Sequence, residues 1–374
     1  LGFEFEGLQK MTEGFEVIKT EQKTINSQWN QPWGEFKTIK DNHNELIVHL
    51  KESNGDQRLV DIIFRVFNDG LGFRYSFPKQ PNLDKVKISN EITQFTFPFD
   101  NEVWWIPVHR ENSYYESFYR KTLMSKTDTI NTPATFETKD KLYLAIHEAN
   151  LTDFASMTLL KSGENQYKSD LVPWADGVKV YAQTPFQTPW RTIIVGENPG
   201  DLVTSTLMLN LNEPSKIEDL SWILPSKYIG IWWGMHLEKF TWGQGPKHGA
   251  TTKNTKEYID FAAKNNLDGV LVEGWNEGWD GDWTADGSAF SFTKPYPDFD
   301  LEGITKYAAE RNVRLIGHHE TAGASLNYEK QLDDAFRLYN KLGVNTVKTG
   351  YVNKYLDKKE WHDSQYGVRH YRKV

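Results

Sequence analysis

Two imidazoles and a carboxylate stand together at the end of a short apolar run, in the segment Arg314-Leu315-Ile316-Gly317-His318-His319-Glu320-Thr321-Ala322-Gly323. Parallel strands that are covered on both faces have continuous apolar runs, so this pattern predicts a buried strand that leads into the polar side chains. Catalytic groups lie at the carboxyl ends of such strands in barrels and open α/β sheets. Glu320 and His318 are therefore candidate active-site residues. The alternative is that both histidines are ordinary core or loop residues and that Glu320 caps the next helix.

A zinc site built from the same residues is disfavoured. Adjacent residues of a strand point to opposite faces, so His318 and His319 are poorly placed to share one metal ion. The sequence has no second pair of histidines at helical spacing.

Polar or aromatic side chains also follow the other predicted strands of this region. They are Trp232 and Trp233, then Glu273, then Lys348. In a parallel barrel these positions converge on one face, where indoles stack on sugar rings and charged groups bind hydroxyls. Each residue also has a structural alternative: Glu273 can bind loop amides, Lys348 can extend into solvent, and the tryptophans can fill the barrel interior.

The elements that position these residues begin at about residue 216. Strand patterns at 228–233, 269–272, 313–316 and 346–348 alternate with helical patterns at 254–265, from Asp300 onward, and at 326–342. Asp300 is predicted to cap the second of these helices, and a last helix begins near Gln365. This alternation predicts a parallel sheet. A closed (β/α)8 barrel needs eight such units, so these residues form either an open sheet or the first half of a barrel. We expect the half barrel, over residues 216–374.

Residues 1–215 have a different pattern, which predicts a β-sandwich domain. Short β-branched and aromatic segments at 45–50, 59–67, 72–78 and 142–147 are separated by turn signals such as Ser53-Asn54-Gly55-Asp56.

The composition excludes several classes of function. The 374 residues carry a net charge of −8 and show no basic run, which argues against a nucleic-acid partner. No apolar run is long enough to span a bilayer, and the visible start lacks a signal segment. The absence of cysteine excludes disulfides and thiolate ligands. Aromatic residues make up 14% of the chain, which suits either a carbohydrate-binding surface or a large β-sheet core.

Several of these segments together resemble glycoside hydrolase family 97, a bacterial family of α-glucosidases and α-galactosidases. The matching runs include Trp104-Trp105-Ile106-Pro107, Thr188-Pro189-Trp190-Arg191-Thr192, Tyr228-Ile229-Gly230-Ile231-Trp232-Trp233, Val272-Glu273-Gly274-Trp275-Asn276, His318-His319-Glu320-Thr321 and Val347-Lys348-Thr349-Gly350-Tyr351. The resemblance implies an N-terminal β-sandwich, a (β/α)8 barrel and a periplasmic or secreted location.

The resemblance also implies roles for individual residues. Glu320 matches the general base that activates water, His318 and Lys348 match sugar contacts, and Trp232 matches a subsite wall. Glu273 is retained as a further substrate contact. Retaining members carry an aspartate nucleophile two residues beyond the lysine, where this chain has Gly350. The chain therefore resembles the inverting α-glucosidase branch, in which a water molecule must fit between the carboxylate and the anomeric carbon.

Finally, the family implies a calcium ion beside the substrate. The ligand contributed by the first domain falls on Glu116, with Glu111 as the alternative. Carboxylate oxygens are suitable calcium ligands. The general acid and the other calcium ligands are expected beyond Val374. We thus expect a calcium-dependent, inverting α-glucosidase that acts on starch-type oligosaccharides; the alternatives are a retaining α-galactosidase and a non-catalytic carbohydrate-binding protein.

Overall fold

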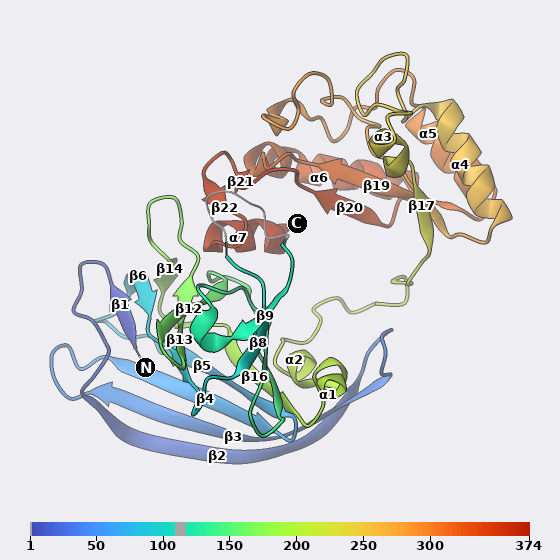
Figure 1. The fold of residues 1–374 in the computed structure, drawn as a ribbon. Helices are drawn as coiled ribbons and strands as arrows, with labels where there is room; N and C mark the ends of the chain where they lie inside the picture. Colours follow the sequence, from blue (N-terminus) through green and yellow to red (C-terminus); the bar gives the residue numbers. More distant parts are fainter. Residues whose placement is uncertain (1, 109–116) are drawn as a thin grey trace. The chain divides into compact units, whose positions relative to one another are not determined.

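The computed structural model describes residues 2–108 and 117–374, and its chain divides into two compact units (Figure 1). The first unit comprises Leu1–Trp222 together with Glu360–Lys373, and the second comprises Ile223–Lys359 with Val374. No helix of the described part is both long and apolar enough to cross a membrane.

The first unit is rich in β-strands, as the sequence predicted. Its strands are β1 (Phe3–Phe5), β2 (Phe15–Asn30), β3 (Thr38–Glu52), β4 (Leu59–Phe67), β5 (Gly70–Phe77), β6 (Lys85–Glu91), β7 (Gln94–Thr96), β8 (Glu102–Trp105), β9 (Arg120–Leu123), β10 (Ala134–Glu137), β11 (Tyr143–Ala149), β12 (Met157–Gly163), β13 (Gln166–Leu171), β14 (Val180–Gln183), β15 (Phe186–Gln187), β16 (Trp190–Gly196) and β22 (Glu360–Trp361). Its helices are η1 (Met124–Lys126), α1 (Pro199–Thr204), α2 (Leu207–Asn210) and α7 (Gln365–Lys373).

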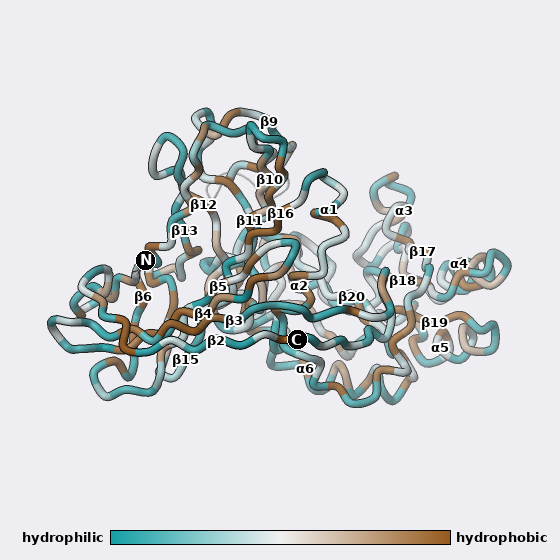
Figure 2. The backbone as a smooth tube through the Cα atoms, turned by 90° about the horizontal axis from the view of Figure 1, so that it is seen from below, coloured by the Kyte–Doolittle hydropathy of each residue, from teal (hydrophilic) through white to brown (hydrophobic). Residues whose placement is uncertain are grey.

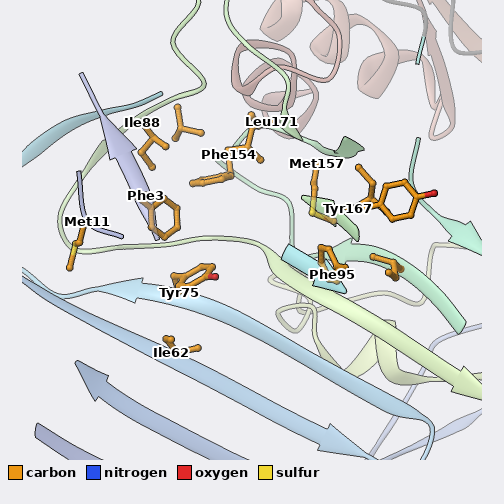
Figure 3. Close-up of a cluster of buried hydrophobic side chains, with 14 of the residues drawn as sticks. Phe3, Met11, Ile62, Tyr75, Ile88, Phe95, Phe154, Met157, Tyr167 and Leu171 are labelled. Carbon is orange, nitrogen blue, oxygen red and sulfur yellow. The ribbon is translucent and has the colours of Figure 1, made fainter. Parts of the chain in front are cut away.

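An antiparallel sheet of ten strands forms the main layer of this unit, in the order β2-β3-β4-β5-β16-β11-β10-β8-β9, with β15 paired to β5. The small sheets β1-β6-β14 and β12-β13-β7 share one hydrophobic core with it. Figure 3 shows part of this core, with Phe3 and Ile88 from one small sheet, Tyr167 from the other, and Ile62 and Tyr75 from the main layer. Burial of this apolar surface stabilises the unit. In Figure 2 the tube of β4 is largely brown, whereas β2, most of whose residues are exposed, is mostly teal.

The second unit contains a parallel sheet with helices between its strands, as the alternation in the sequence predicted. Its strands are β17 (Tyr228–Gly230), β18 (Gly269–Leu271), β19 (Arg314–Glu320), β20 (Val347–Gly350) and β21 (Tyr355–Leu356). Its helices are α3 (Trp232–His236), α4 (Thr252–Lys264), η2 (Gly287–Ala289), α5 (Leu301–Ala309) and α6 (Ser325–Leu342). The order is β17-β18-β19-β20, and each neighbouring pair is parallel.

Side-chain caps begin the helices α4 and α5. Asp300 accepts a hydrogen bond from the amide of Gly303 at the start of α5, as the sequence predicted, and Thr251 accepts one from the amide of Asn254 at the start of α4. Such caps satisfy amide groups that have no partner inside the helix. Gly343 ends α6 in the left-handed conformation, with φ of 74°.

Two predicted boundaries were wrong. Trp232 and Trp233 do not extend a strand but lie in the short helix α3. The reason is that pairing with β18 stops at Ile231, whose amide donates a hydrogen bond to the carbonyl of Leu271 at 3.3 Å. The strand predicted to end at Ile316 continues to Glu320. The reason is that β20 pairs with residues Gly317 to Glu320 after β18 has paired with residues Arg314 to Ile316.

Candidate active site

Glu320, at the end of β19, is a buried carboxylate held by backbone amides. Its Oε1 atom accepts hydrogen bonds from the amides of Ala322 at 2.7 Å and Val352 at 2.8 Å. Burial raises the pKa of Glu320, the two amides oppose this, and the negative charge of Glu273 raises it further. Because Oε1 already has two donors, Oε2 is the oxygen left to act on another group.

Gly350 is the residue of β20 that lies opposite Glu320 in the sheet. A Cβ atom built on Gly350 would lie 3.0 Å from Oε2 of Glu320. The carbonyl of Gly350 accepts hydrogen bonds from the amide of Thr321 at 3.1 Å and from its hydroxyl at 3.0 Å. The backbone of residue 350 is thus fixed against β19, while its missing side chain leaves Oε2 uncovered.

Glu273 joins three other side chains of the unit. Its Oε1 accepts a hydrogen bond from Nζ of Lys348 at 2.9 Å, and Nε2 of His318 lies 3.6 Å from the same oxygen. Its Oε2 accepts a hydrogen bond from the indole of Trp242 at 3.3 Å. Glu273 is buried, whereas the side chain of Lys348 is 47% exposed. The strand ends therefore do bring Glu273, His318 and Lys348 together.

The two adjacent histidines face opposite sides of β19, as expected of neighbouring strand residues. His318 lies beside Glu273, and its ring stacks on Trp279 with centroids 5.9 Å apart. His319 instead lies against α6, where its Nδ1 is 2.8 Å from the hydroxyl of Tyr328 and its ring stacks on Tyr339 at 4.9 Å. His319 is therefore a packing residue.

Both histidines are neutral near physiological pH. Burial, reinforced by the charge of Lys348, lowers the pKa of His318 to about 3. Burial, reinforced by His318, lowers the pKa of His319 to about 3. A neutral imidazole at His318 can take part in hydrogen bonds without adding charge to the Glu273–Lys348 pair.

Trp232 reaches this group through aromatic contacts. It is 43% exposed, and its ring lies 4.0 Å from that of His236, which in turn lies 5.9 Å from the ring of Trp242. The indole of Trp242 is the one that donates to Glu273. Trp232 is thus an exposed indole at the edge of the cluster.

The structure adds residues that the sequence alone did not single out. The ring of Trp242 lies parallel to that of Trp279 at 6.4 Å, and the indole of Trp275 donates a hydrogen bond to the carbonyl of His318 at 2.8 Å. Gly317 allows Tyr339 to pack closely against β19, since a Cβ atom at residue 317 would lie 2.4 Å from the ring of Tyr339. The density of tryptophan after the first and second strands was the available signal.

The predicted calcium ligand Glu116 and its alternative Glu111 lie outside the described residues. Within residues 2–108 and 117–374, no group of three or more imidazole and carboxylate side chains is arranged to hold a metal ion. The groups that the structure brings together at the strand ends are side chains of the second unit.

A parallel sheet with carboxylate, imidazole, ammonium and indole groups at its strand ends is the kind of site that carbohydrate-active enzymes use. Two family models agree. The model described as Glycosyl-hydrolase 97 N-terminal matches residues 1–214, and the one described as Glycoside hydrolase 97 matches residues 232–374. The chain belongs to glycoside hydrolase family 97.

Solved structures of this family are similar to the chain. A family 97 enzyme in complex with acarbose, from Pseudoalteromonas sp. strain K8, is 48% identical with a TM-score of 0.95, over 99% of this chain and 58% of that one. A variant of a family 97 enzyme from that strain, in complex with panose, matches equally well. A retaining alpha-galactosidase from Bacteroides thetaiotaomicron is 23% identical over 91% of this chain and 53% of its own length. The chain thus spans little more than half the length of these relatives.

Proposed function

We propose that the protein is an inverting α-glucosidase that acts on starch-type α-glucosides, with Glu320 as its general base. One observation supports this proposal above all: Oε1 of Glu320 is occupied by two amides, and Oε2 lies beside the position where Gly350 has no side chain. Inversion requires a water molecule between the base and the anomeric carbon. A residue with a side chain at position 350 would occupy part of that space.

The proposed step uses the free oxygen of Glu320. Oε2 removes a proton from water, the water oxygen bonds to the anomeric carbon on the face opposite the leaving group, and the glycosidic C–O bond breaks as the leaving oxygen receives a proton from an acid. Burial raises the pKa of Glu320, which makes its carboxylate a stronger base than an exposed one. Lys348, paired with Glu273, and neutral His318 hold the sugar hydroxyls, while Trp232 offers an apolar face to the ring.

The nature of the relatives' ligands favours glucosides over galactosides. Acarbose and panose, the ligands in the 48% identical structures, are α-linked oligosaccharides built largely on glucose. The second candidate is a retaining α-galactosidase, because the relatives at 23% and 26% identity carry that name or its probable form. A retaining mechanism needs a carboxylate nucleophile about 5 Å from the acid, and position 350, where the resemblance placed it, is glycine.

Three further features belong to the same proposal. The four parallel strands and their helices form part of a (β/α)8 barrel that follows a β-sandwich, with the boundary near residue 215. A calcium ion, with Glu116 or Glu111 among its ligands, supports the site, and a chelator should then abolish hydrolysis until Ca²⁺ is restored. The protein acts in the periplasm or outside the cell.

The stereochemistry of the product tests the function directly. We expect proton NMR of the intact protein with an α-glucoside to show β-glucose first. Initial formation of α-glucose would refute inversion, and preference for an α-galactoside would favour the second candidate.

The variant Glu320→Gln tests the proposed base. It keeps an acceptor for both amides but cannot take a proton, so kcat should fall by about 10² to 10⁴-fold. Hydrolysis near the parent rate would show that Glu320 is not the base. Sugar binding without hydrolysis in the intact parent protein would indicate a carbohydrate-binding role instead.

A further inference from the structure

Buried arginines of the first unit are normally matched by carboxylates. Arg58 donates to both carboxylate oxygens of Glu52, at 2.6 and 2.7 Å. Arg191 donates to both oxygens of Glu91, at 2.9 and 2.6 Å. This is the expected arrangement, because a buried charge without a counter-ion is costly.

Arg74 on β5 is the exception among the described residues. It is only 9% exposed, its Nε atom is buried without a hydrogen-bond partner, and no described carboxylate forms an ion pair with it. Its guanidinium lies over the ring of Trp190 at 4.3 Å, and the guanidinium of Arg65 lies over the same ring at 4.9 Å. Arg65 already has Glu45 as its partner, at 2.8 Å.

The electrostatic consequence is an excess of positive charge around Arg74. Burial and the neighbouring Arg65 lower the pKa of Arg74 to about 10, while the charges of Glu213 and Glu45 raise it. The side chain is still protonated at neutral pH. It is therefore a buried cation that lacks an anion in contact.

Arg74 lines an open hollow of about 1030 Å³ in the first unit, which we call the Arg74 hollow. Three more cations, Lys85, Lys87 and Arg369, line it, against a single lining carboxylate, Asp153; Lys87 also pairs at 3.5 Å with Glu6, which lies outside the lining. The carboxylate of Asp153 is already occupied, because it accepts hydrogen bonds from Arg369 at 2.6 Å and from Gln365 at 2.8 Å. The hollow therefore favours an anionic ligand.

The rest of the lining suits a hydroxyl-rich molecule rather than a bare ion. The amides Asn150, Gln183 and Gln187 supply neutral donors and acceptors, and Phe186, which stacks on Phe77 at 4.6 Å, supplies an apolar face. The volume matches that of small-molecule sites and far exceeds that of a single oxyanion.

We propose that the Arg74 hollow binds an acidic saccharide, whose carboxylate or sulfate oxygens accept hydrogen bonds from the guanidinium of Arg74. Arginine presents parallel N–H donors that match such oxygens in pairs. The sugar hydroxyls bind the surrounding amides, and Lys85 adds charge at the side of the hollow. The site belongs to the β-rich unit and does not depend on Glu320.

Calorimetry on the intact protein tests the ligand class with glucuronic acid, glucose 6-sulfate, glucose and inorganic sulfate. We expect at least one acidic sugar to bind at least about tenfold more tightly than glucose or sulfate alone, because one hydrogen bond to a charged group strengthens binding by about that factor or more. The acidic sugar that binds identifies the anion as carboxylate or sulfate ester. If glucose bound as tightly as the acidic sugars, the hollow would not require an anionic group. If inorganic sulfate bound as tightly, the hollow would not recognise the sugar part of the ligand.

Variants locate the binding. Arg74→Met should weaken binding of the acidic sugar by about tenfold or more without loss of thermal stability, because an apolar side chain replaces an unpaired buried charge. Arg337→Met, at an exposed arginine of α6, is the matched control and should bind as the parent does. The Lys85→Gln variant is expected to fold normally and should weaken binding of the acidic sugar about threefold. If both Arg74→Met and Lys85→Gln bound the acidic sugar with unchanged affinity, the sugar would lie elsewhere and the proposal would be refuted. Loss of affinity for the acidic sugar in Glu320→Gln would refute it as well.

Discussion

Gly350 and Glu320 face each other across two paired strands, and the absent side chain of the first leaves one oxygen of the second uncovered: a Cβ atom on residue 350 would lie 3.0 Å from Oε2. This distance is shorter than most contacts of a real Cβ atom, so even a methyl group would displace the carboxylate. The pair therefore controls how much space a water molecule has beside the proposed base.

Gly350→Ala should lower kcat by about tenfold or more, because a small displacement of a catalytic group has a large effect on rate. The KM value should change less, since Lys348 and His318 are not displaced. Gly230→Ala is the matched control at the end of β17, where the nearest atom to an added Cβ is at 3.5 Å. Steady-state kinetics on an α-glucoside measures both variants. A parent-like kcat in the Gly350→Ala variant would show that the space is not used.

Glu273→Gln should move the acidic limb of the kcat/KM profile to lower pH. The base must be ionised, so activity falls as the pH drops below the pKa of Glu320. The charge of Glu273 raises that pKa, and its removal lowers the pKa and extends activity into more acidic solution. Glu277→Gln, at an exposed carboxylate of the same loop, should leave the limb where it is. A limb that stays fixed or moves to higher pH in Glu273→Gln would contradict this account.

Acid should destabilise the protein through its buried histidines. His318 and His319 have pKa values lowered to about 3 in the folded state, whereas an unfolded histidine titrates near 6.5. Between these values the unfolded state binds more protons, so stability is complete above about pH 6.5 and falls as the pH drops toward about 3. Each histidine contributes a slope of up to about 1.4 kcal/mol per pH unit.

Urea denaturation at pH 6.5 and pH 5 separates this effect from carboxylate titration. His319→Asn keeps a partner for Tyr328 and should reduce the loss of unfolding free energy between these two pH values. His236→Asn, at an exposed histidine of α3, is the control and should lose as much unfolding free energy between pH 6.5 and pH 5 as the parent does. An identical pH dependence for parent and His319→Asn would exclude His319 as a source of the effect.

Gln365 should be one of the most sensitive positions for stability. Its Nε2 donates to the backbone and side chain of Asp153 and to the carbonyl of Tyr181, and its Oε1 accepts from the amide of Tyr181 and the indole of Trp174. Gln365 itself is fully buried, so Gln365→Leu removes all of these hydrogen bonds at a site closed to water and should lower the unfolding free energy by about 3 kcal/mol. Arg372→Ala, at an exposed position of α7, is the control. A loss below about 1 kcal/mol in a chemical denaturation curve would show that water replaces the amide.

The sequence was most informative where side-chain periodicity is simple. The run before His318 predicted a buried strand because both of its faces are covered, and Asp300 predicted a helix start because its side chain binds a free amide. The meeting of Glu273 with Lys348 followed from one rule, that parallel strands place their carboxyl ends at the same edge.

Other features depend on contacts that no local pattern encodes. The end of β19 is set by pairing with β20, and the helical state of Trp232 follows from the loss of a pairing partner after Ile231. Neither can be read from propensity. The two amides that bind Glu320 come from residues 2 and 32 positions away, and backbone groups leave no signature in side-chain types.

The last helix of the described chain, α7, returns to the β-rich unit after the chain has passed through the second one. Gene fragments designed with a single cut between the two regions would separate this helix from Asp153 and Tyr181, and the shortened β-rich piece would expose surfaces that Gln365 and Arg369 otherwise cover. A recombinant version of that unit should therefore carry residues 360–373 on a linker, or it will be less soluble than its composition suggests.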